Sequence, residues 1–238
     1  MGVVSLAKHP AGPAAGGFYT VREAARLLNI SNAAVISGWV KGRSGRGSGP
    51  VIVRQYQPIG RVQELSFLDL IEVRFIEHFR KQGYSLQSLR KAAETARAEL
   101  DCEHPFALYG VKFVAERKNI FLKVARDIGD AKLLNLVTKQ YAMYDILEEV
   151  LSRGLRFDPT KGRVTCWRPR EKEFPGIIVD PTVAYGQPAL EANRVPTDAI
   201  FSTWKAEGGD YAAVADWFYP PSKWWTPLIS SYWSWKGV

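Results

Sequence analysis

Apolar residues recur at helical spacing in two short runs near the start of the chain, within residues 18–42. Thr20 precedes the first run and Glu23 follows three residues later, which is the pattern of a capping box at a helix start. Asn29 interrupts the first run, and Ser31 is the predicted cap of the second. The spacing predicts two short helices joined by a tight turn.

The second of these helices is expected to pack against the first. Val35 and Trp39 are four residues apart and so share one helical face. Two short helices with a tight turn form a helix-turn-helix, whose second helix can enter the major groove of DNA. A glycine-rich basic stretch follows at 41–50, and the β-branched run 51–56 is a predicted strand. This order predicts a winged helix-turn-helix.

Two longer amphipathic helices are predicted next. The first covers residues 67–82, with Ser66 as its cap, and the second runs from Ser85 to about residue 100. The acidic residues of the first helix are predicted to form a solvated face: Asp69, Glu72 and Glu77.

Beyond residue 100 the pattern alternates between β and helical periods. Residues 109–124 are predicted as a β-hairpin with its turn at 117–119. Helical spacing returns over 131–153, and short strands are predicted at 163–167 and 177–179. Residues 171–175 are the predicted linker between domains.

The C-terminal region contains a second pair of short helices. Thr197 is the predicted cap of one helix that ends at Gly208, and Asp210 the cap of another that ends near Pro220. Four of the eight tryptophans lie in the last fifteen residues, where burial in the same chain and anchoring to a partner are equally expected.

The predicted fold class is α+β and mostly helical. It combines an N-terminal winged helix-turn-helix, a middle helical and β region, and a small C-terminal helical domain that resembles a helix-turn-helix. The predicted divisions are a flexible tail (1–17), a DNA-binding domain (18–60), a middle dimerisation region (61–175) and a C-terminal domain with a tryptophan-rich tail (176–238).

Charge is distributed unevenly along the chain, whose formal net charge is +8. Residues 1–60 hold seven basic residues and one acidic residue, whereas residues 158–238 hold nine of each. A basic region that overlaps a helix-turn-helix indicates a nucleic-acid partner. No apolar run reaches the length of a membrane helix or of a signal-peptide core, and the two cysteines are isolated, so we expect a cytoplasmic protein.

The sequence contains no recognisable catalytic set. Its three histidines and two cysteines lack the paired spacing of a structural zinc site, and no phosphate-binding glycine motif is present. We therefore expect neither enzymatic activity nor a metal or cofactor.

Two segments resemble known families. The stretch YTVREAARLLNIS with its following Trp39 resembles the MerR-like winged helix-turn-helix. The stretch IIVDPTVAYGQPAL with RVPTDAIFSTWKAEGGDYAAVADWF resembles domain of unknown function 433. Together they resemble the larger mycobacterial-type VapB antitoxins. The resemblance implies a homodimer that represses its own operon and neutralises a toxin with a PIN-like ribonuclease fold.

The expected function is therefore that of an antitoxin, with a stand-alone helix-turn-helix transcriptional regulator as the alternative. The residues expected to contact operator DNA are Arg22, Asn32, Ser37, Lys41, Arg43, Arg46 and Arg54. Those expected to contact the toxin are Trp217, Phe218, Lys223, Trp224, Trp225, Trp233 and Trp235.

Overall fold

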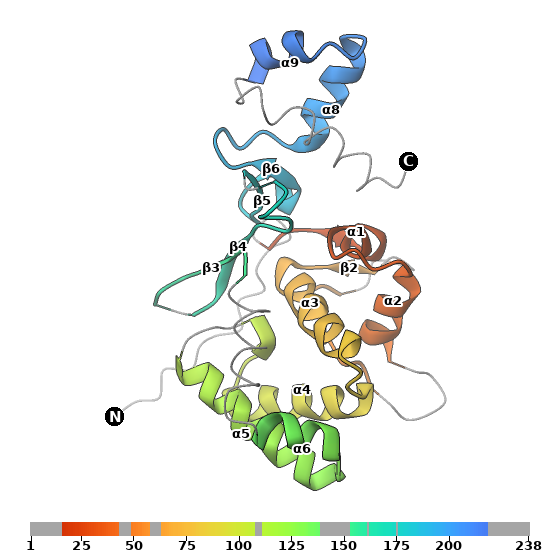
Figure 1. The fold of residues 1–238 in the computed structure, drawn as a ribbon, viewed down its shortest axis with the longest axis vertical. Coiled ribbons are helices and arrows are strands. Elements are labelled where there is room, and N and C mark those ends of the chain that lie inside the picture. Colours follow the sequence, from red (N-terminus) through yellow and green to blue (C-terminus); the bar gives the residue numbers. More distant parts are fainter. Residues whose placement is uncertain are drawn as a thin grey trace.

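The fold is mixed α and β, as predicted, with many helices and two small antiparallel sheets (Figure 1). The structure is a computed structural model, and it describes residues 16–42, 49–57, 63–107, 111–138, 153–160, 162–174 and 176–218. Among these residues, no helix is long and apolar enough to span a membrane.

The first four helices begin at polar capping residues. Their bounds are α1 (Val21–Leu27), α2 (Ala33–Lys41), α3 (Phe67–Lys81) and α4 (Leu86–Leu100). Thr20 and Ser66 form the predicted capping boxes, and the Ser85 hydroxyl accepts a hydrogen bond from the third residue of α4. The prediction for α2 was wrong by one residue. Asn32, not Ser31, caps that helix, and its side chain accepts from the amide of Ala34.

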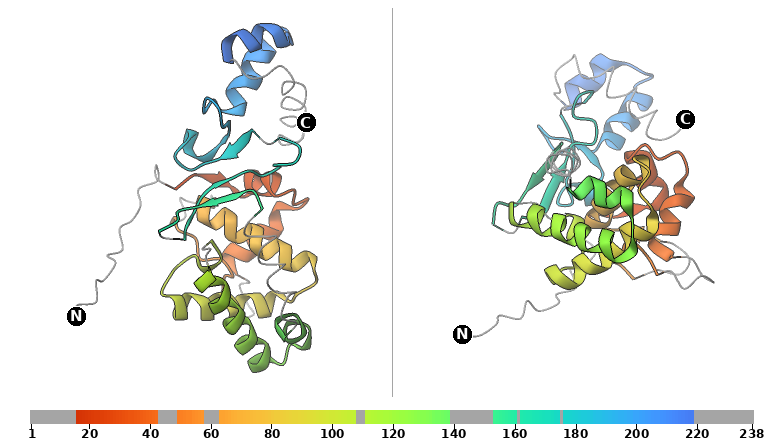
Figure 2. Two further views of the ribbon diagram at one scale, coloured as in Figure 1. Left: turned by 60° about the vertical axis from the view of Figure 1, so that its left-hand side comes forward. Right: turned by 60° about the horizontal axis from the view of Figure 1, so that its bottom comes forward.

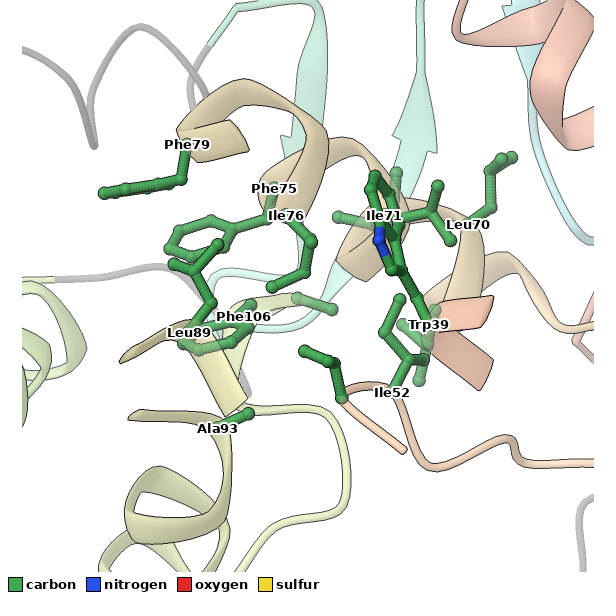
Figure 3. Close-up of a cluster of buried hydrophobic side chains, with 14 of the residues drawn as sticks. Trp39, Ile52, Leu70, Ile71, Phe75, Ile76, Phe79, Leu89, Ala93 and Phe106 are labelled. Carbon is green, nitrogen blue, oxygen red and sulfur yellow. The ribbon is translucent and has the colours of Figure 1, made fainter. Parts of the chain in front are cut away.

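Helix α3 is the centre of the main hydrophobic core. Ten of its fifteen residues are buried, and its aromatic rings contact neighbouring elements. Phe75 stacks on Phe106 with ring centroids 4.2 Å apart, and Phe79 lies 5.6 Å from Phe121. Trp39 and Ile52 lie toward the other end of the same cluster (Figure 3). The dimerisation role predicted for residues 61–175 stays a proposal.

The predicted β-hairpin at 109–124 is wrong. This region forms helix α5 (Val111–Ile128), followed by α6 (Ala131–Thr138). The buried residues Ile120, Phe121, Val124 and Ala125 recur at helical spacing, and this period prevails over the short alternations that favoured strands. The rest of the helix predicted up to residue 153 falls mostly outside the described residues.

The predicted strand at 51–56 is also wrong. Val51 and Ile52 are buried, but their segment is irregular, and it contacts the core without joining a sheet. The small N-terminal sheet instead pairs β1 (Tyr19–Thr20) with β2 (Glu64–Leu65) in antiparallel register. The winged arrangement therefore stays a proposal.

A second antiparallel sheet has the strand order β3-β4-β5-β6. Its strands are β3 (Leu155–Phe157), β4 (Val164–Trp167), β5 (Ile177–Val179) and β6 (Pro188–Leu190). The strands predicted near β4 and β5 are confirmed, whereas β3 and β6 were not predicted. Trp167 of β4 pairs with Val179 of β5, so the segment predicted as an interdomain linker, 171–175, connects neighbouring strands of one sheet. The described residues also include two short 3-10 helices: η2 (Pro105–Ala107) and η3 (Ala184–Gly186).

Helices α8 (Thr197–Ala206) and α9 (Tyr211–Phe218) form a separate small unit at the C-terminal side. They lie beyond the four-stranded sheet, at the end of the molecule away from α4–α6 (Figures 1 and 2). Asp210 caps α9 as predicted, since its carboxylate accepts from the amides of Ala212 and Ala213. Thr197 is not a cap. It is the first residue of α8, after Pro196.

Candidate nucleic-acid and protein interfaces

Helices α1 and α2 pack together through their apolar faces. Ala24, Ala25 and Leu27 of α1 are buried, as are Ile36, Trp39 and Val40 of α2. Between the helices Asn29 adopts a positive φ of 53°, which asparagine tolerates better than most residues. The two short helices and the tight turn predicted from the sequence are therefore present, and their identity as a helix-turn-helix stays a proposal. The predicted packing of Val35 is wrong, because this side chain is 39% exposed.

The predicted DNA-contacting residues are not equally available. Arg22 on α1 and Lys41 at the end of α2 are exposed, whereas Ser37 and Arg54 are half-buried. The side chain of Asn32 is exposed, but its oxygen is engaged by the Ala34 amide at 2.9 Å. Arg43 and Arg46 lie outside the described residues.

The outer side of α2 presents small side chains. Ala34, Val35 and Gly38 line an open groove of about 610 Å³, which α2 shares with the end of α3 and the start of α4. An ideal Cβ built on Gly38 would meet nothing within 4 Å. Helix α2 has no arginine at its exposed positions, so it lacks the side chain that most often reads guanine in the major groove.

Three further basic side chains lie beside the expected interface and were not selected from the sequence. Arg26 is exposed on α1, and Arg80 and Lys81 line the groove beside α2. Lys81 also pairs with Glu77, with Nζ 3.3 Å from Oε1. The proximity of the end of α3 to α2 is a tertiary feature, so no local pattern could have indicated it.

Residues 49–51 are held by hydrogen bonds to both α2 and α4. The amide of Val51 donates to the carbonyl of Trp39 at 2.8 Å, and Arg90 Nε donates to the carbonyl of Gly49 at 2.8 Å. Arg97 donates to the carbonyl of Val51 at 3.2 Å. Gly49 and Val51 are thereby held in a defined position.

A buried cluster of ionisable side chains contacts the neighbouring segment at Gln55. The predicted solvated face of α3 is wrong, because Asp69 and Glu72 are 0% and 1% exposed. One Asp69 oxygen accepts from the amides of Ser66 and Gln55, at 2.8 and 3.3 Å. The other lies 3.6 Å from Nδ1 of His104, which is also 3.6 Å from a Glu72 oxygen. These contacts join α3 to His104 and to the segment that contains Gln55.

Charge and burial act in opposite senses on this cluster. Burial alone would lower the pKa of His104, but the neighbouring carboxylates of Glu72 and Asp69 raise it above its ordinary value. Burial raises the pKa of Asp69, although His104 and the backbone amides partly offset that shift. Relative to the unfolded chain, the fold therefore shifts His104 toward its protonated form.

A second set of contacts joins the N-terminal and C-terminal parts. The buried phenol of Tyr19 donates to the carbonyl of Gly186 at 2.8 Å, and the amide of Phe18 donates to the carbonyl of Tyr185 at 3.0 Å. Burial raises the pKa of Tyr19 well above its ordinary value, so the phenol remains a donor. Ala184, Tyr185 and Gly186 all have positive φ, and Tyr185 is 68% exposed.

The C-terminal unit carries part of the predicted toxin-contacting set. Trp217 is 68% exposed on α9, and Phe218 is half-buried against the small core of the unit. The remaining predicted residues lie outside the described part of the chain: Lys223, Trp224, Trp225, Trp233 and Trp235. No group of three or more metal-binding side chains in a suitable arrangement occurs within the described ranges.

Comparison with known proteins finds a relative by sequence and a solved structure of similar fold. No family model matches the chain. The chain is 23% identical over 213 residues to a Mycobacterium tuberculosis protein named "Putative antitoxin VapB45", which covers 83% of this chain and 86% of that protein. The crystal structure of Rv2018 from the same organism has a TM-score of 0.69 at 21% identity, over 89% of this chain and 96% of the other. This likeness shows a shared fold.

Proposed function

We propose that this chain is the antitoxin of a type II toxin–antitoxin pair, which binds operator DNA and neutralises a PIN-like ribonuclease. The observation that carries the proposal is the extent of the similarity to the protein named as a VapB antitoxin, which spans most of both chains. A match of that extent involves more than one short helical motif. An antitoxin is a regulatory partner without catalysis, which agrees with the absence of a catalytic set in the sequence.

The N-terminal helix pair is the proposed DNA-binding part. Two packed helices with a tight turn, exposed Arg22 and Lys41, and the basic sequence that carries Arg43 and Arg46 support contacts with phosphate. Because the outer side of α2 has small side chains, the affinity is expected to come mainly from phosphate contacts. We further propose that the protein acts as a homodimer in the cytoplasm, since such readers usually pair over two half-sites.

Toxin neutralisation is tested by co-expression. Each reading frame that adjoins this gene is induced in a bacterial host alone and then together with the full chain. Growth arrest by the first and recovery with the second supports the antitoxin. If growth does not recover while the chain still binds and represses its own promoter, the result would support the stand-alone transcriptional regulator instead.

A further inference from the structure

The exposed side of α2 is small and apolar. Ala34 and Gly38 are four residues apart and lie on that side with Val35, whose side chain is 39% exposed. All three line the open groove that α2 shares with α3 and α4. Since an ideal Cβ on Gly38 would meet nothing within 4 Å, a binding partner can approach the backbone of α2 closely at this position. Beside that point it would meet the methyl groups of Val35.

Basic side chains lie along the same groove. Arg80 and Lys81 line it from the end of α3, and Lys41 is exposed on α2 three residues after Gly38. The acidic lining residue, Glu77, is paired with Lys81, with 3.3 Å between Oε1 and Nζ. An apolar strip with cations beside it complements a partner that carries negative charge at its edges and apolar groups between them.

The major groove of DNA has this combination of groups. Phosphates line both of its edges, and the C5-methyl group of thymine is the apolar group that its base pairs present there. A recognition helix contacts base edges with its N-terminal residues, and Ala34 and Val35 are the second and third residues of α2. Neither side chain can form a hydrogen bond, so their means of distinguishing bases is apolar contact.

We propose that α2 recognises thymine methyl groups in the operator, with Val35 as the specificity-determining contact and Gly38 as the point of close approach. This inference rests on the DNA-binding part of the proposed function, and it names the base chemistry that this helix reads. Phosphate contacts supply most of the affinity, and the methyl contact supplies discrimination in a helix without exposed arginine. Loss of one buried methyl group is expected to weaken binding about fourfold.

The test uses deoxyuridine, which pairs as thymidine does but lacks the methyl group. Footprinting with the full chain first locates the protected half-sites in the promoter of this gene. Thymines in each half-site are then replaced by uracil one at a time, and the Kd is measured by fluorescence anisotropy. At least one replacement in each half-site is expected to weaken binding by the wild-type chain about fourfold.

Two variants connect this loss to α2. Val35→Ala is expected to bind the unmodified duplex about fourfold more weakly than the wild type, and to lose nothing further at the sensitive thymines. Gly38→Leu fills the space needed for close approach. It is expected to lose the preference for the promoter over a scrambled duplex while it still binds both through phosphate. Both variants should keep the unfolding midpoint of the wild type, because position 35 is exposed and position 38 is open.

Matched controls exist for the protein and for the DNA. Val53 is 40% exposed and lies outside α2, so Val53→Ala controls for the loss of an exposed valine and should keep the wild-type response to uracil. Uracil at thymines outside the protected half-sites should leave the Kd unchanged.

Each outcome supports or overturns the inference. If the wild type binds its promoter and uracil weakens binding at no position, the inference is wrong while DNA binding stands. If Val35→Ala loses as much with uracil as the wild type does, another residue or the shape of the DNA senses the methyl group, and the assignment to Val35 is wrong. If the wild type binds no promoter duplex at low salt, the DNA-binding part of the proposed function fails together with the inference. A smaller sedimentation mass for free Val35→Ala would assign the groove to a second copy of the chain and overturn the proposal.

Discussion

At the scale of single residues, the buried cluster of Asp69, Glu72 and His104 places two carboxylates beside one imidazole inside the core. Acidic residues at i and i+3 of a helix are usually solvated, and the sequence gives no sign that His104 returns to α3 from 32 residues beyond Glu72. The cluster exists because tertiary packing supplies a cation and backbone donors to carboxylates that burial alone would penalise.

The first prediction concerns the pH dependence of stability. The folded-state pKa of His104 is raised, so its contribution to the free energy of unfolding is full below about pH 6.5 and is lost as pH rises through the raised value. Unfolding by urea, followed by circular dichroism between pH 6 and pH 9, should show falling stability. His104→Gln should remove this slope and cost about 3–5 kcal/mol at pH 6, because two buried carboxylates lose their cation.

His78→Gln is the control for this experiment. His78 also lies on α3 but is half-buried, and its ring contacts the side chain of Gln82. This variant should keep the pH slope of the wild type. A His104→Gln protein with an unchanged slope would show that the buried cluster does not govern the pH dependence.

The second prediction concerns Trp39, whose burial was expected from its place in the second short helix and is confirmed at 4% exposure. Trp39→Ala should lower the free energy of unfolding by about 3–5 kcal/mol, since the ring would leave a cavity beside Ile52 and Ile71 (Figure 3). Chemical denaturation measures this cost. Val35→Ala on the exposed side of the same helix should change stability by no more than about 0.5 kcal/mol. Equal effects would contradict the packing of α2.

At the scale of elements, capping residues predicted where helices begin better than hydrophobic periodicity predicted whether a segment is a helix or a strand. Thr20, Ser66, Ser85 and Asp210 all cap helices as expected, because capping depends on contacts within three residues. Segment 111–128 was misassigned because its short apolar runs fit both periods, and its partners in the core are distant in sequence. Strands β3 and β6 were missed because their three residues include no β-branched side chain, whereas the equally short β5 consists of Ile, Ile and Val.

The third prediction concerns Arg43 and Arg46, in the basic sequence that follows α2. Replacing both Arg43 and Arg46 by glutamine should weaken specific and non-specific DNA binding alike, because phosphate contacts carry no sequence information. Affinity for the promoter duplex, measured by fluorescence anisotropy at several salt concentrations, should show a slope smaller by about 0.9 for each contact removed. A glutamine double variant of the exposed Arg163 and Arg194 is the control and should bind normally. An affinity independent of salt would refute phosphate binding.

At the scale of the whole molecule, the N-terminal helix pair is physically connected to the C-terminal region. The Tyr19–Gly186 hydrogen bond joins residues 167 positions apart, and Gly186 has a φ of 83°. An ideal Cβ at this position would lie 2.2 Å from the Tyr19 hydroxyl oxygen. Glycine is therefore required there both by backbone conformation and by space.

The fourth prediction compares two variants of this junction. Tyr19→Phe should cost about 1 kcal/mol of unfolding free energy, since it removes one hydrogen bond and keeps the ring. Gly186→Ala should cost more, because it adds backbone strain and a steric clash. Denaturant unfolding ranks the two, and Gly38→Ala, with open space around its Cβ, should not destabilise. Gly186→Ala with wild-type stability would disprove the close contact.

The central claim is that one chain binds DNA through its basic N-terminal part and a toxin through its C-terminal unit. Sedimentation velocity of the full chain with its promoter duplex and the purified candidate toxin tests this claim most directly. The account predicts one species whose mass contains all three components, and Trp217→Ala should lose the toxin from that species while keeping the DNA. A toxin that never joins the DNA-bound chain, or a chain that sediments without DNA at low salt, would contradict it.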